Sequence, residues 1–277
     1  MLNFNGNLLN DSEGFVSFGN RGLQYGDALF ETLRISNGKI NFWEDHYFRL
    51  MASMRILRME IPMSFSMEFL ENEVMKTIGT SENTRVKIFI NRKTGGKYTP
   101  ETNDIDYMVA SEELDNSFYT LDESPYTVEL YKDFYIPSNM LSTLKISSKI
   151  TNVLGSIYAK ENDYNNCLLL NENKQVVEAL NGNIFLVKGT EIITPPIEDG
   201  CLRGIMRKQL ISICKKSEKF TIIEKSISPF DLQKADELLI TNVIVGIQPI
   251  TKYRKKEFAS VVAKELLQKL NMIARLQ

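Results

Sequence analysis

One stretch of the chain, Leu144–Phe185, constrains the fold more than any other. It begins with a lysine, Lys145, just ahead of a run in which apolar residues recur at helical spacing. Two short segments that resemble strands, 167–170 and 175–178, follow on either side of a polar turn, and a third comes after Asn-Gly-Asn. The pattern predicts a helix followed by short strands. Lys145 and Glu178 are distant in sequence, but they could meet in one cleft if each lies at the end of a strand.

Length and composition are ordinary for a soluble globular enzyme. The 277 residues allow one large domain or two modest ones, and 43% of the residues are apolar while 25% are charged. A net charge of −2 gives no electrostatic support for binding nucleic acid or an acidic membrane. The N-terminus lacks the basic and apolar regions of a signal peptide, and no apolar run approaches the length of a membrane span. We therefore expect a cytoplasmic protein that binds neither nucleic acid nor membranes.

The histidine and cysteine content excludes several kinds of site. The chain has a single histidine, His46, which rules out a multi-histidine metal site and argues against a catalytic triad. The three cysteines, Cys167, Cys201 and Cys214, have no metal-type spacing and indicate reduced thiols in a cytosol. We therefore predict no metal site, and a catalytic reaction would depend on other side chains or on an organic cofactor.

The stretch that begins at Lys145 resembles the cofactor core of the fold type IV pyridoxal-phosphate enzymes, the class IV aminotransferases. This family includes branched-chain and D-amino-acid aminotransferases and aminodeoxychorismate lyase. Its core has a Schiff-base lysine and, further on, a glutamate followed by a short spacer and Asn-x-Phe, which Lys145, Glu178 and Asn183–Phe185 match. Lys149 lies too close to Glu178 for the usual spacing of the family, so we select Lys145. The resemblance extends over almost the whole chain.

The resemblance implies a separate task for each of these groups. The amine of Lys145 would hold the aldehyde of pyridoxal 5′-phosphate and, after the substrate amine displaces it, move the α-proton. It must be partly desolvated, or close to another cation, so that enough of it is unprotonated. Glu178 would place a negative charge beside the pyridine nitrogen and favour its protonated form. Either residue alone would be interpreted as a solvated surface charge. The spacing and the flanking motifs favour a role in cofactor binding instead.

A second family motif lies nearer the N-terminus. The run from His46 to Leu50 matches His, two residues, Arg-Leu, in which the arginine binds the cofactor phosphate, here Arg49. A guanidinium group suits this role because it stays charged and offers a planar fork to the phosphate. His46 lies on the same helical face as Arg49, and we interpret it as a structural neighbour of the arginine and not as an acid or base.

Two further cofactor motifs follow in the C-terminal half. The family has a glycine-led helix start, and here Ile205 and Met206 would donate backbone N–H groups to the phosphate, while Leu202 would pack on the cofactor ring. Many aminotransferases place a phosphate-binding threonine later, where this chain has Val243. Some lyase-like members have an asparagine one residue earlier, which corresponds to Asn242, and we predict that it binds the cofactor.

Four residues are candidates for contacts with the substrate. A Tyr-Gly-Asp run leads into a predicted strand that contains Phe30 and Thr32. Successive side chains of a strand face opposite sides, and by resemblance one of these sides faces the active site. Lyase members use a threonine in this region, but Thr32 also simply suits a strand, and both interpretations stay open. Some members bind the substrate carboxylate with a basic or glycine-bearing loop, which here contains Arg92 and Lys97.

Periodicity and turn residues predict the order of the elements. Strands are expected at 2–5, 15–18, 29–34, 85–91, 106–112, 126–131, 192–196 and 220–224, helices at 43–58, 64–78 and 258–270, and a hairpin turn at 36–39. The expected class is α/β (α+β), with a two-domain D-amino-acid-aminotransferase-like fold and the cofactor between the domains. We predict a smaller N-terminal α/β domain at 1–113, a linker at 114–125 and a larger C-terminal α/β domain at 126–277 that carries the Schiff-base lysine. By resemblance the protein is a homodimer.

Three functions are compatible with these motifs. The first is transamination between an amino acid and a 2-oxo acid. The second is the aminodeoxychorismate lyase reaction, which releases pyruvate and forms 4-aminobenzoate from a chorismate-derived substrate. Residues 242–243 favour the lyase, whereas residues 30–32 occur in both groups. The third is a non-catalytic binding protein on the same scaffold, against which Lys145, Glu178 and Arg49 argue.

Overall fold

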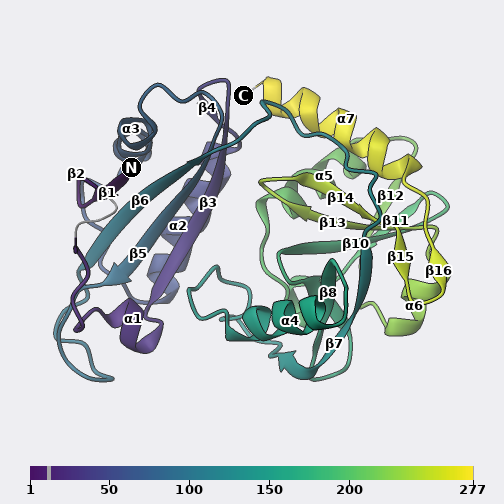
Figure 1. Cartoon of the computed structure of the whole chain (residues 1–277), viewed down its shortest axis with the longest axis horizontal. Coiled ribbons are helices and arrows are strands. Elements are labelled where there is room, and N and C mark those ends of the chain that lie inside the picture. The colour runs from purple at the N-terminus through teal and green to yellow at the C-terminus, as the bar shows by residue number, and fades with distance from the viewer. Residues whose placement is uncertain (11–13, 277) are drawn as a thin grey trace. The chain divides into compact units, whose positions relative to one another are not determined.

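A computed structural model describes residues 1–10 and 14–276, and these form two compact units. The first unit contains Met1–Phe118 and the short segment Lys145–Ser148, and the second contains Tyr119–Leu144 and Lys149–Leu276. Each unit has its own sheet and helices (Figure 1), which confirms the predicted mixed α/β class. The predicted domain limits remain a prediction. The structure adds that Lys145–Ser148 packs within the first unit.

The first unit is built on one antiparallel sheet of six strands in the order β2-β1-β6-β5-β3-β4. Its strands are β1 (Leu2–Phe4), β2 (Asn7–Leu9), β3 (Ala28–Ser36), β4 (Lys39–Ile40), β5 (Thr84–Arg92) and β6 (Ile105–Glu113), and its helices are α1 (Arg21–Tyr25), α2 (Trp43–Ile56) and α3 (Met67–Ile78). The predicted hairpin between β3 and β4 is confirmed. Asn37 and Gly38 both have positive φ, 51° and 73°, which is the geometry of a tight two-residue hairpin turn.

The predicted strand at 15–18 is wrong. The strand that pairs with β1 is β2, and Phe4 lies opposite Asn7 in the register. Asn5 and Gly6 have φ of 50° and 87°, so the chain reverses directly after β1. An Asn-Gly pair between two short runs is a strong hairpin signal, and it outweighs the later turn residues.

Helices α2 and α3 cover one face of this sheet, and β3 shows why (Figure 1). Leu29 and Leu33 are fully buried against these helices, whereas Phe30 and Thr32 alternate with them and are half-buried on the opposite face. The apolar residues of α2 and α3 recur at helical spacing and complete the core. They include Leu50, Met51, Met54, Leu70, Val74 and Ile78.

The second unit is built on a mixed sheet of ten strands. Eight of them run in the order β12-β11-β10-β9-β8-β7-β15-β16, and β13 pairs with both β10 and β14. The strands are β7 (Thr127–Ile136), β8 (Asn166–Asn171), β9 (Val176–Ala179), β10 (Gly182–Lys188), β11 (Glu191–Thr194), β12 (Thr221–Glu224), β13 (Glu237–Asn242), β14 (Gly246–Ile250), β15 (Lys252–Tyr253) and β16 (Lys256–Glu257). The helical segments are α4 (Ile150–Glu161), η1 (Ile197–Asp199), α5 (Ile205–Lys215), α6 (Pro229–Lys234) and α7 (Val261–Arg275).

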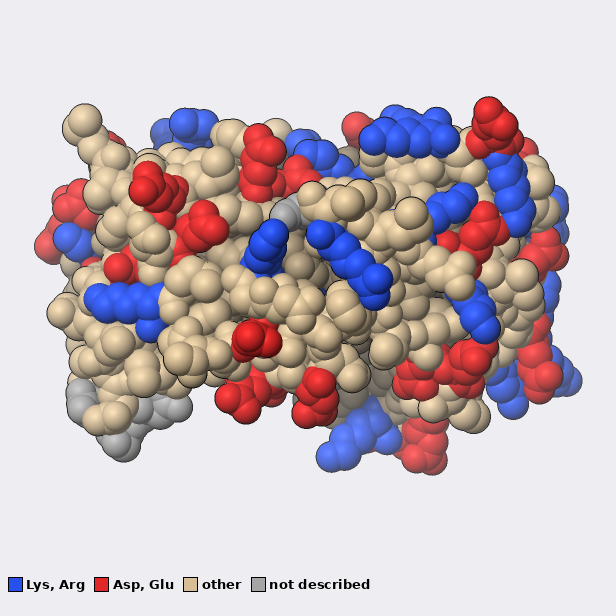
Figure 2. Space-filling view, turned by 90° about the horizontal axis from the view of Figure 1, so that it is seen from above, with Lys and Arg blue, Asp and Glu red and all other residues tan. Residues whose placement is uncertain are grey.

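Strand β8 is buried on both faces, which explains why its sequence is a continuous apolar run. Leu168 and Leu170 belong to one apolar cluster, and Cys167 and Leu169 belong to a second cluster that includes residues of α4. The three cysteines are buried free thiols. On the face seen in Figure 2, acidic and basic side chains are interspersed, in keeping with the small net charge.

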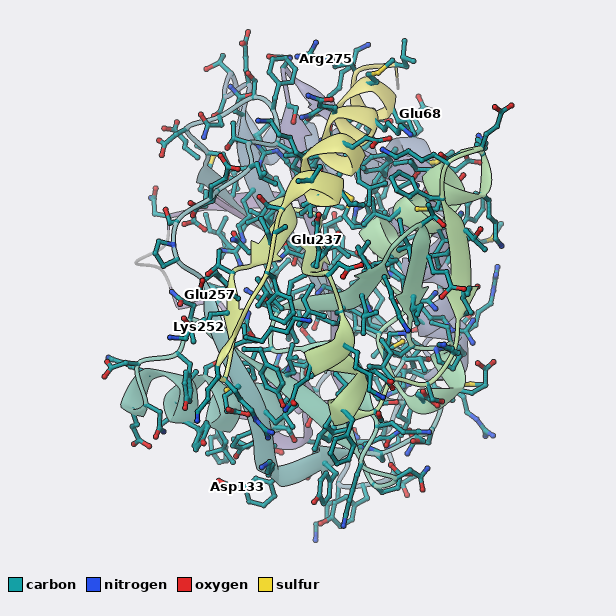
Figure 3. All side chains as sticks on the ribbon, turned by 90° about the vertical axis from the view of Figure 1, so that its right-hand side faces the viewer. Glu68, Asp133, Glu237, Lys252, Glu257 and Arg275 are labelled. Atoms are coloured by element: carbon teal, nitrogen blue, oxygen red, sulfur yellow. The ribbon has the colours of Figure 1, made fainter. Side chains whose placement is uncertain are left out.

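The last helix, α7, begins at a buried carboxylate from another element. Val262 and Ala263 donate backbone N–H groups to Glu237 at 2.8 and 3.0 Å, while Ser260 makes no side-chain cap. Figure 3 shows Glu237 at one end of this helix and Arg275 at the other. A carboxylate satisfies the free N–H groups and complements the helix dipole. This explains why α7 starts at Val261, three residues later than predicted.

Candidate functional site

Lys145 is held beside the start of β3 by backbone pairing. Phe30 donates its N–H to the carbonyl of Lys145 at 2.9 Å, and Ser147 donates its N–H to the carbonyl of Ala28 at 2.9 Å. The Lys145 Nζ atom consequently lies 4.4 Å from the centroid of the Phe30 ring. The structure thus brings together two residues that the sequence placed in one site, although they are far apart along the chain.

A buried ionic cluster lies on the other face of β3. Arg49 donates to Glu31 twice, from Nε to Oε1 at 2.7 Å and from Nη2 to Oε2 at 2.5 Å. The Nδ1 atom of His46 lies 2.7 Å from Oε2 of Glu31. Burial alone raises the pKa of Glu31, but the charge of Arg49 and the hydrogen bond from His46 outweigh it and lower the pKa to about 2. The carboxylate is therefore ionised and His46 must donate to it. The predicted proximity of His46 to Arg49 is confirmed.

Arg92, one of the candidate substrate residues, is bonded to several groups within the first unit. It is buried, and its guanidinium donates to Asp27 at 3.0 Å, to the Asn103 side chain at 2.6 Å and to the Leu57 carbonyl at 2.7 Å. These bonds tie β5 to the loops around it. Nε and both terminal nitrogens are therefore engaged inside the unit, and the substrate contact of Arg92 remains a prediction.

Lys97 lies in an exposed loop that α1 holds in place. Arg21 donates from Nη1 to the Lys97 carbonyl at 2.6 Å and to the Gly95 carbonyl at 3.1 Å. The Lys97 side chain is exposed, so its amine is compatible with the predicted substrate contact. That role remains a prediction.

Sequence reasoning missed Lys87, which shares a face of the sheet with Phe30 and Thr32. It is directly opposite Thr32 in the β3–β5 register, and its Nζ lies 4.6 Å from the centroid of the Phe30 ring. Burial and the charge of Arg85 lower the pKa of Lys87. Alternation along β5 could have identified this residue, because it places Lys87 on the face opposite the apolar core.

In the second unit the predicted cofactor residues converge on Asn183. Glu178 and Asn183 are cross-strand partners in β9 and β10. Asn183 donates from Nδ2 to the Leu202 carbonyl at 2.9 Å, and the Leu202 N–H donates to Oε2 of Glu178 at 2.9 Å. Glu178 is 7% exposed, so its carboxyl group is buried and accepts a backbone N–H group. The Asn-x-Phe motif therefore orients both the glutamate and the segment that carries Leu202.

The start of α5 lies against the same asparagine. Gly204 is the N-cap residue of α5, and no side chain caps this end of the helix. The first turn, which contains Ile205 and Met206, therefore presents uncapped backbone N–H groups. Both residues are buried. A Cβ atom on Gly204 would lie 2.0 Å from Oδ1 of Asn183, which explains why glycine is needed here.

We predict that Gly204→Ala lowers the free energy of unfolding by about 1–3 kcal/mol, the usual penalty for overpacking. The added methyl would force Asn183 away from Leu202 and shift the start of α5. Urea unfolding would measure the loss. Gly14→Ala is the matched control because no atom of the described part of the chain lies within 4 Å of its added Cβ. Equal stability of the two variants would contradict the packing argument.

Asn242 organises the turn between β13 and β14. Its Oδ1 accepts the backbone N–H groups of Ile244 at 3.0 Å and Val245 at 3.1 Å. The preceding residue, Thr241, pairs with Asn183, which places this turn next to Asn183 and its contacts with Leu202. The Thr241 hydroxyl donates to the Gly246 carbonyl at 2.6 Å, so it is engaged within the turn. Val243, the next residue of the turn, has no side-chain hydroxyl.

The predicted residues thus form two groups, one in each unit. Lys145, Phe30 and Thr32, together with Arg49 at the ionic cluster, belong to the first. Glu178, Leu202, Ile205, Met206 and Asn242 belong to the second. Within residues 1–10 and 14–276, His, Cys, Asp and Glu side chains form no group of three or more that could hold a metal ion. The helices in these ranges include none with the length and apolar character needed to cross a membrane.

Comparison with known proteins identifies the family. The model of the family described as amino-transferase class IV matches residues 28–253, which is most of the chain. D-alanine aminotransferase of Staphylococcus aureus is 27% identical over 265 residues, covering 90% of this chain and 87% of the relative. Aminodeoxychorismate lyase of Vibrio harveyi is 24% identical over 238 residues, covering 85% and 86%.

The fold agrees with this result. The branched-chain aminotransferase of the thermophilic archaeon Thermoproteus uzoniensis, solved with norvaline, superposes with a TM-score of 0.88 at 22% identity, covering 99% of this chain and 94% of the other. This confirms the predicted fold type. The order of the Lys145, Glu178 and Asn183 motifs, the contacts made by Asn183 and the extent of the family match lead to one conclusion: the chain is an enzyme of the class IV aminotransferase family.

Proposed function

We propose that the protein is a pyridoxal 5′-phosphate-dependent aminotransferase that transfers an amino group between an amino acid and a 2-oxo acid. The observation that supports this most directly is the position of Lys145, which backbone pairing holds with its amine 4.4 Å from the Phe30 ring centroid. The family as a whole depends on pyridoxal phosphate, and this chain retains a lysine, an arginine and a glutamate at the matching positions.

The residues present suit this cofactor. An ionised phosphate needs cations and N–H donors, which Arg49 and the first turn of α5 at Ile205 and Met206 offer. A protonated pyridine nitrogen needs an anion, and Glu178 is a nearly buried carboxylate. When bound, pyridoxal phosphate supplies an aldehyde that condenses with amines and a ring that withdraws electrons from the substrate α-carbon.

Each side chain would then have a defined task. Lys145 would hold the aldehyde of the cofactor, and its Nζ would take and return the substrate α-proton. Glu178 would favour the protonated form of the ring nitrogen. Asn183 orients Glu178 through Leu202, and Asn242 contributes from the β13–β14 turn.

Aminodeoxychorismate lyase is the second candidate. Asn242 followed by Val243 favours it, because the hydroxyl that many aminotransferases carry here is missing. Thr32 also supports it, since this residue is half-buried on the face of β3 that carries Phe30.

The experiment that separates the two functions supplies the purified enzyme with pyridoxal phosphate and compares two assays. One assay offers aminodeoxychorismate and measures pyruvate and 4-aminobenzoate. The other offers pairs of amino acids and 2-oxo acids and measures amino-group exchange. Exchange without pyruvate release supports the aminotransferase, and pyruvate release without exchange supports the lyase. A protein that stays colourless and inactive with added cofactor contradicts both proposals.

We also propose that the protein is a cytoplasmic homodimer. Its buried, unpaired thiols suit a reducing compartment. The second unit exposes large apolar side chains at the end of β7, in the loop that follows β7, and on α4. They are between 42% and 63% exposed, and monomers rarely leave a large group of apolar side chains uncovered. They are Phe134, Tyr135, Met140, Leu141, Ile150, Val153 and Ile157. Tyr131 links the two segments, with ring contacts to Phe134 and to Tyr158 of α4.

We predict that Ile157→Lys converts the dimer to a monomer, because a charge in the centre of an apolar contact loses its hydration without a partner. Sedimentation velocity would measure the change. Lys160→Gln, an exposed substitution on the same helix, is the control and should leave the dimer intact. A dimer that persists in Ile157→Lys would place the subunit contact elsewhere.

A further inference from the structure

Glu31 is an ionised group in the apolar core of the first unit. It lies on the face of β3 that carries Leu29 and Leu33, and it is only 1% exposed. Removing a carboxylate from water is costly unless partners compensate for the lost hydration. An apolar side chain would fill this position more simply, so the placement of Glu31 calls for an explanation beyond packing.

The partners of Glu31 fix the orientation of Arg49. Both carboxylate oxygens accept from the arginine, at 2.7 Å from Nε and 2.5 Å from Nη2. This fork–fork contact sets the plane of the guanidinium as well as its position. Without it, a long arginine side chain would lose considerable rotamer entropy each time it adopted one orientation. The Arg49 side chain is 12% exposed, so part of it reaches the surface of the unit while its fork is anchored inside.

His46 supports the carboxylate from the same helix. Its ring is fully buried, and its Nδ1 donates to Oε2 of Glu31, the oxygen that also accepts from Arg49. Burial lowers the pKa of His46 most strongly, Glu31 opposes this, and the charges of Arg49 and Lys145 lower it further. The imidazole is therefore neutral and acts as a hydrogen-bond donor. The cluster also lies within electrostatic range of Lys145.

We propose that Glu31 and His46 are positioning residues, which hold the Arg49 guanidinium in the orientation that binds the cofactor phosphate. Glu31 acts directly through its fork, and His46 acts by holding Glu31. Neither residue needs to touch the cofactor or the substrate. This inference rests on the proposed function, because it assigns Arg49 to the phosphate of pyridoxal phosphate.

The test compares two ligands that differ only in the phosphate. Pyridoxal phosphate and pyridoxal are each titrated into the cofactor-free enzyme, and the dissociation constants are measured from absorbance. Glu31→Gln should weaken binding of pyridoxal phosphate by about tenfold to a hundredfold, the range for loss of a charge-assisted hydrogen bond, and should change pyridoxal binding by less than about twofold. Once Arg49→Gln has been introduced, adding Glu31→Gln should cause no further loss, because the two residues act as one unit.

Glu73 provides a matched control. It is a buried carboxylate of the same unit that accepts from Asn3 at 2.7 Å and from Tyr107 at 3.0 Å, on a different helix from Arg49. Glu73→Gln should lower stability while leaving the ratio of the two dissociation constants unchanged. For His46, the variant His46→Asn keeps an N–H donor and should retain most of the phosphate preference, whereas His46→Leu should lose it.

The possible results distinguish a failure of the positioning role from a failure of the proposed function. If wild-type enzyme prefers pyridoxal phosphate but Glu31→Gln weakens both ligands equally, or if its effect adds to that of Arg49→Gln, the positioning role is wrong and the proposed function stands. If the wild-type enzyme binds neither ligand, the proposed function fails and the positioning role fails with it. A loss confined to pyridoxal phosphate, absent in Glu73→Gln, supports the inference.

Discussion

Replacing Lys145 by alanine should abolish covalent attachment of the cofactor and reduce turnover by about a thousandfold or more. The loss should be large because the proposed mechanism gives this one amine two tasks, to hold the aldehyde and to move the proton. The fold should survive, because the segment is fixed to Phe30 and Ala28 by backbone hydrogen bonds that alanine retains. The measurements are borohydride reduction followed by mass spectrometry of the labelled peptide, steady-state kinetics, and circular dichroism of the variant.

Lys149 is the natural control for this experiment. It lies four residues further along the chain, at the N-cap of α4, and belongs to the second unit. Lys149→Ala should retain cofactor attachment and most of the activity. Turnover that survives in Lys145→Ala but is lost in Lys149→Ala would transfer the role to Lys149.

Glu178→Gln should reduce kcat by roughly a hundredfold or more, because a neutral amide no longer favours the protonated ring nitrogen. The substitution is informative because its amide oxygen can still accept the Leu202 N–H that Glu178 Oε2 accepts at 2.9 Å. The Leu202 segment should therefore keep its position, and the variant isolates the effect of the charge. Single-turnover kinetics with the cofactor loaded would measure the change separately from binding.

Glu172→Gln supplies the comparison in the same unit. Glu172 is an exposed carboxylate that accepts from the Ser138 N–H at 3.0 Å, and the same loss of charge there should leave kcat unchanged. If Glu178→Gln retains the activity of wild type, its carboxylate does not tune the ring, and the proposed assignment of Glu178 is wrong.

Local sequence patterns were enough to predict much of the fold. Alternation in β3 predicted that successive residues face opposite sides of the sheet, and Asn37-Gly38 predicted its hairpin, because strand periodicity and positive-φ turns depend on neighbouring residues. The same kind of signal was overlooked at Asn5-Gly6, where the chain turns earlier than expected. The beginning of α7 could not be predicted locally, because Glu237 accepts its free N–H groups from a distant strand.

The candidate site, like the fold, could be predicted from the sequence only in part. Motif order along the chain was enough to assign the family, because the spacing of its motifs is visible in one dimension. The roles of Lys145, Glu178 and Arg49 that these motifs imply remain predictions. The same reasoning could not reveal the partners of Arg92, which are visible only in the fold, and it missed Lys87.

The amino-acid sequence by itself determined the family, the mixed class of the fold and the residue types that a pyridoxal-phosphate enzyme needs. Only the tertiary structure decided which groups hold those residues in place, such as Glu31 on Arg49 and Asn183 on Leu202. The physical reason is that these contacts join residues far apart in the chain. A buried charge or amide finds its partners only when strands and helices pack, and linear spacing carries no record of that packing.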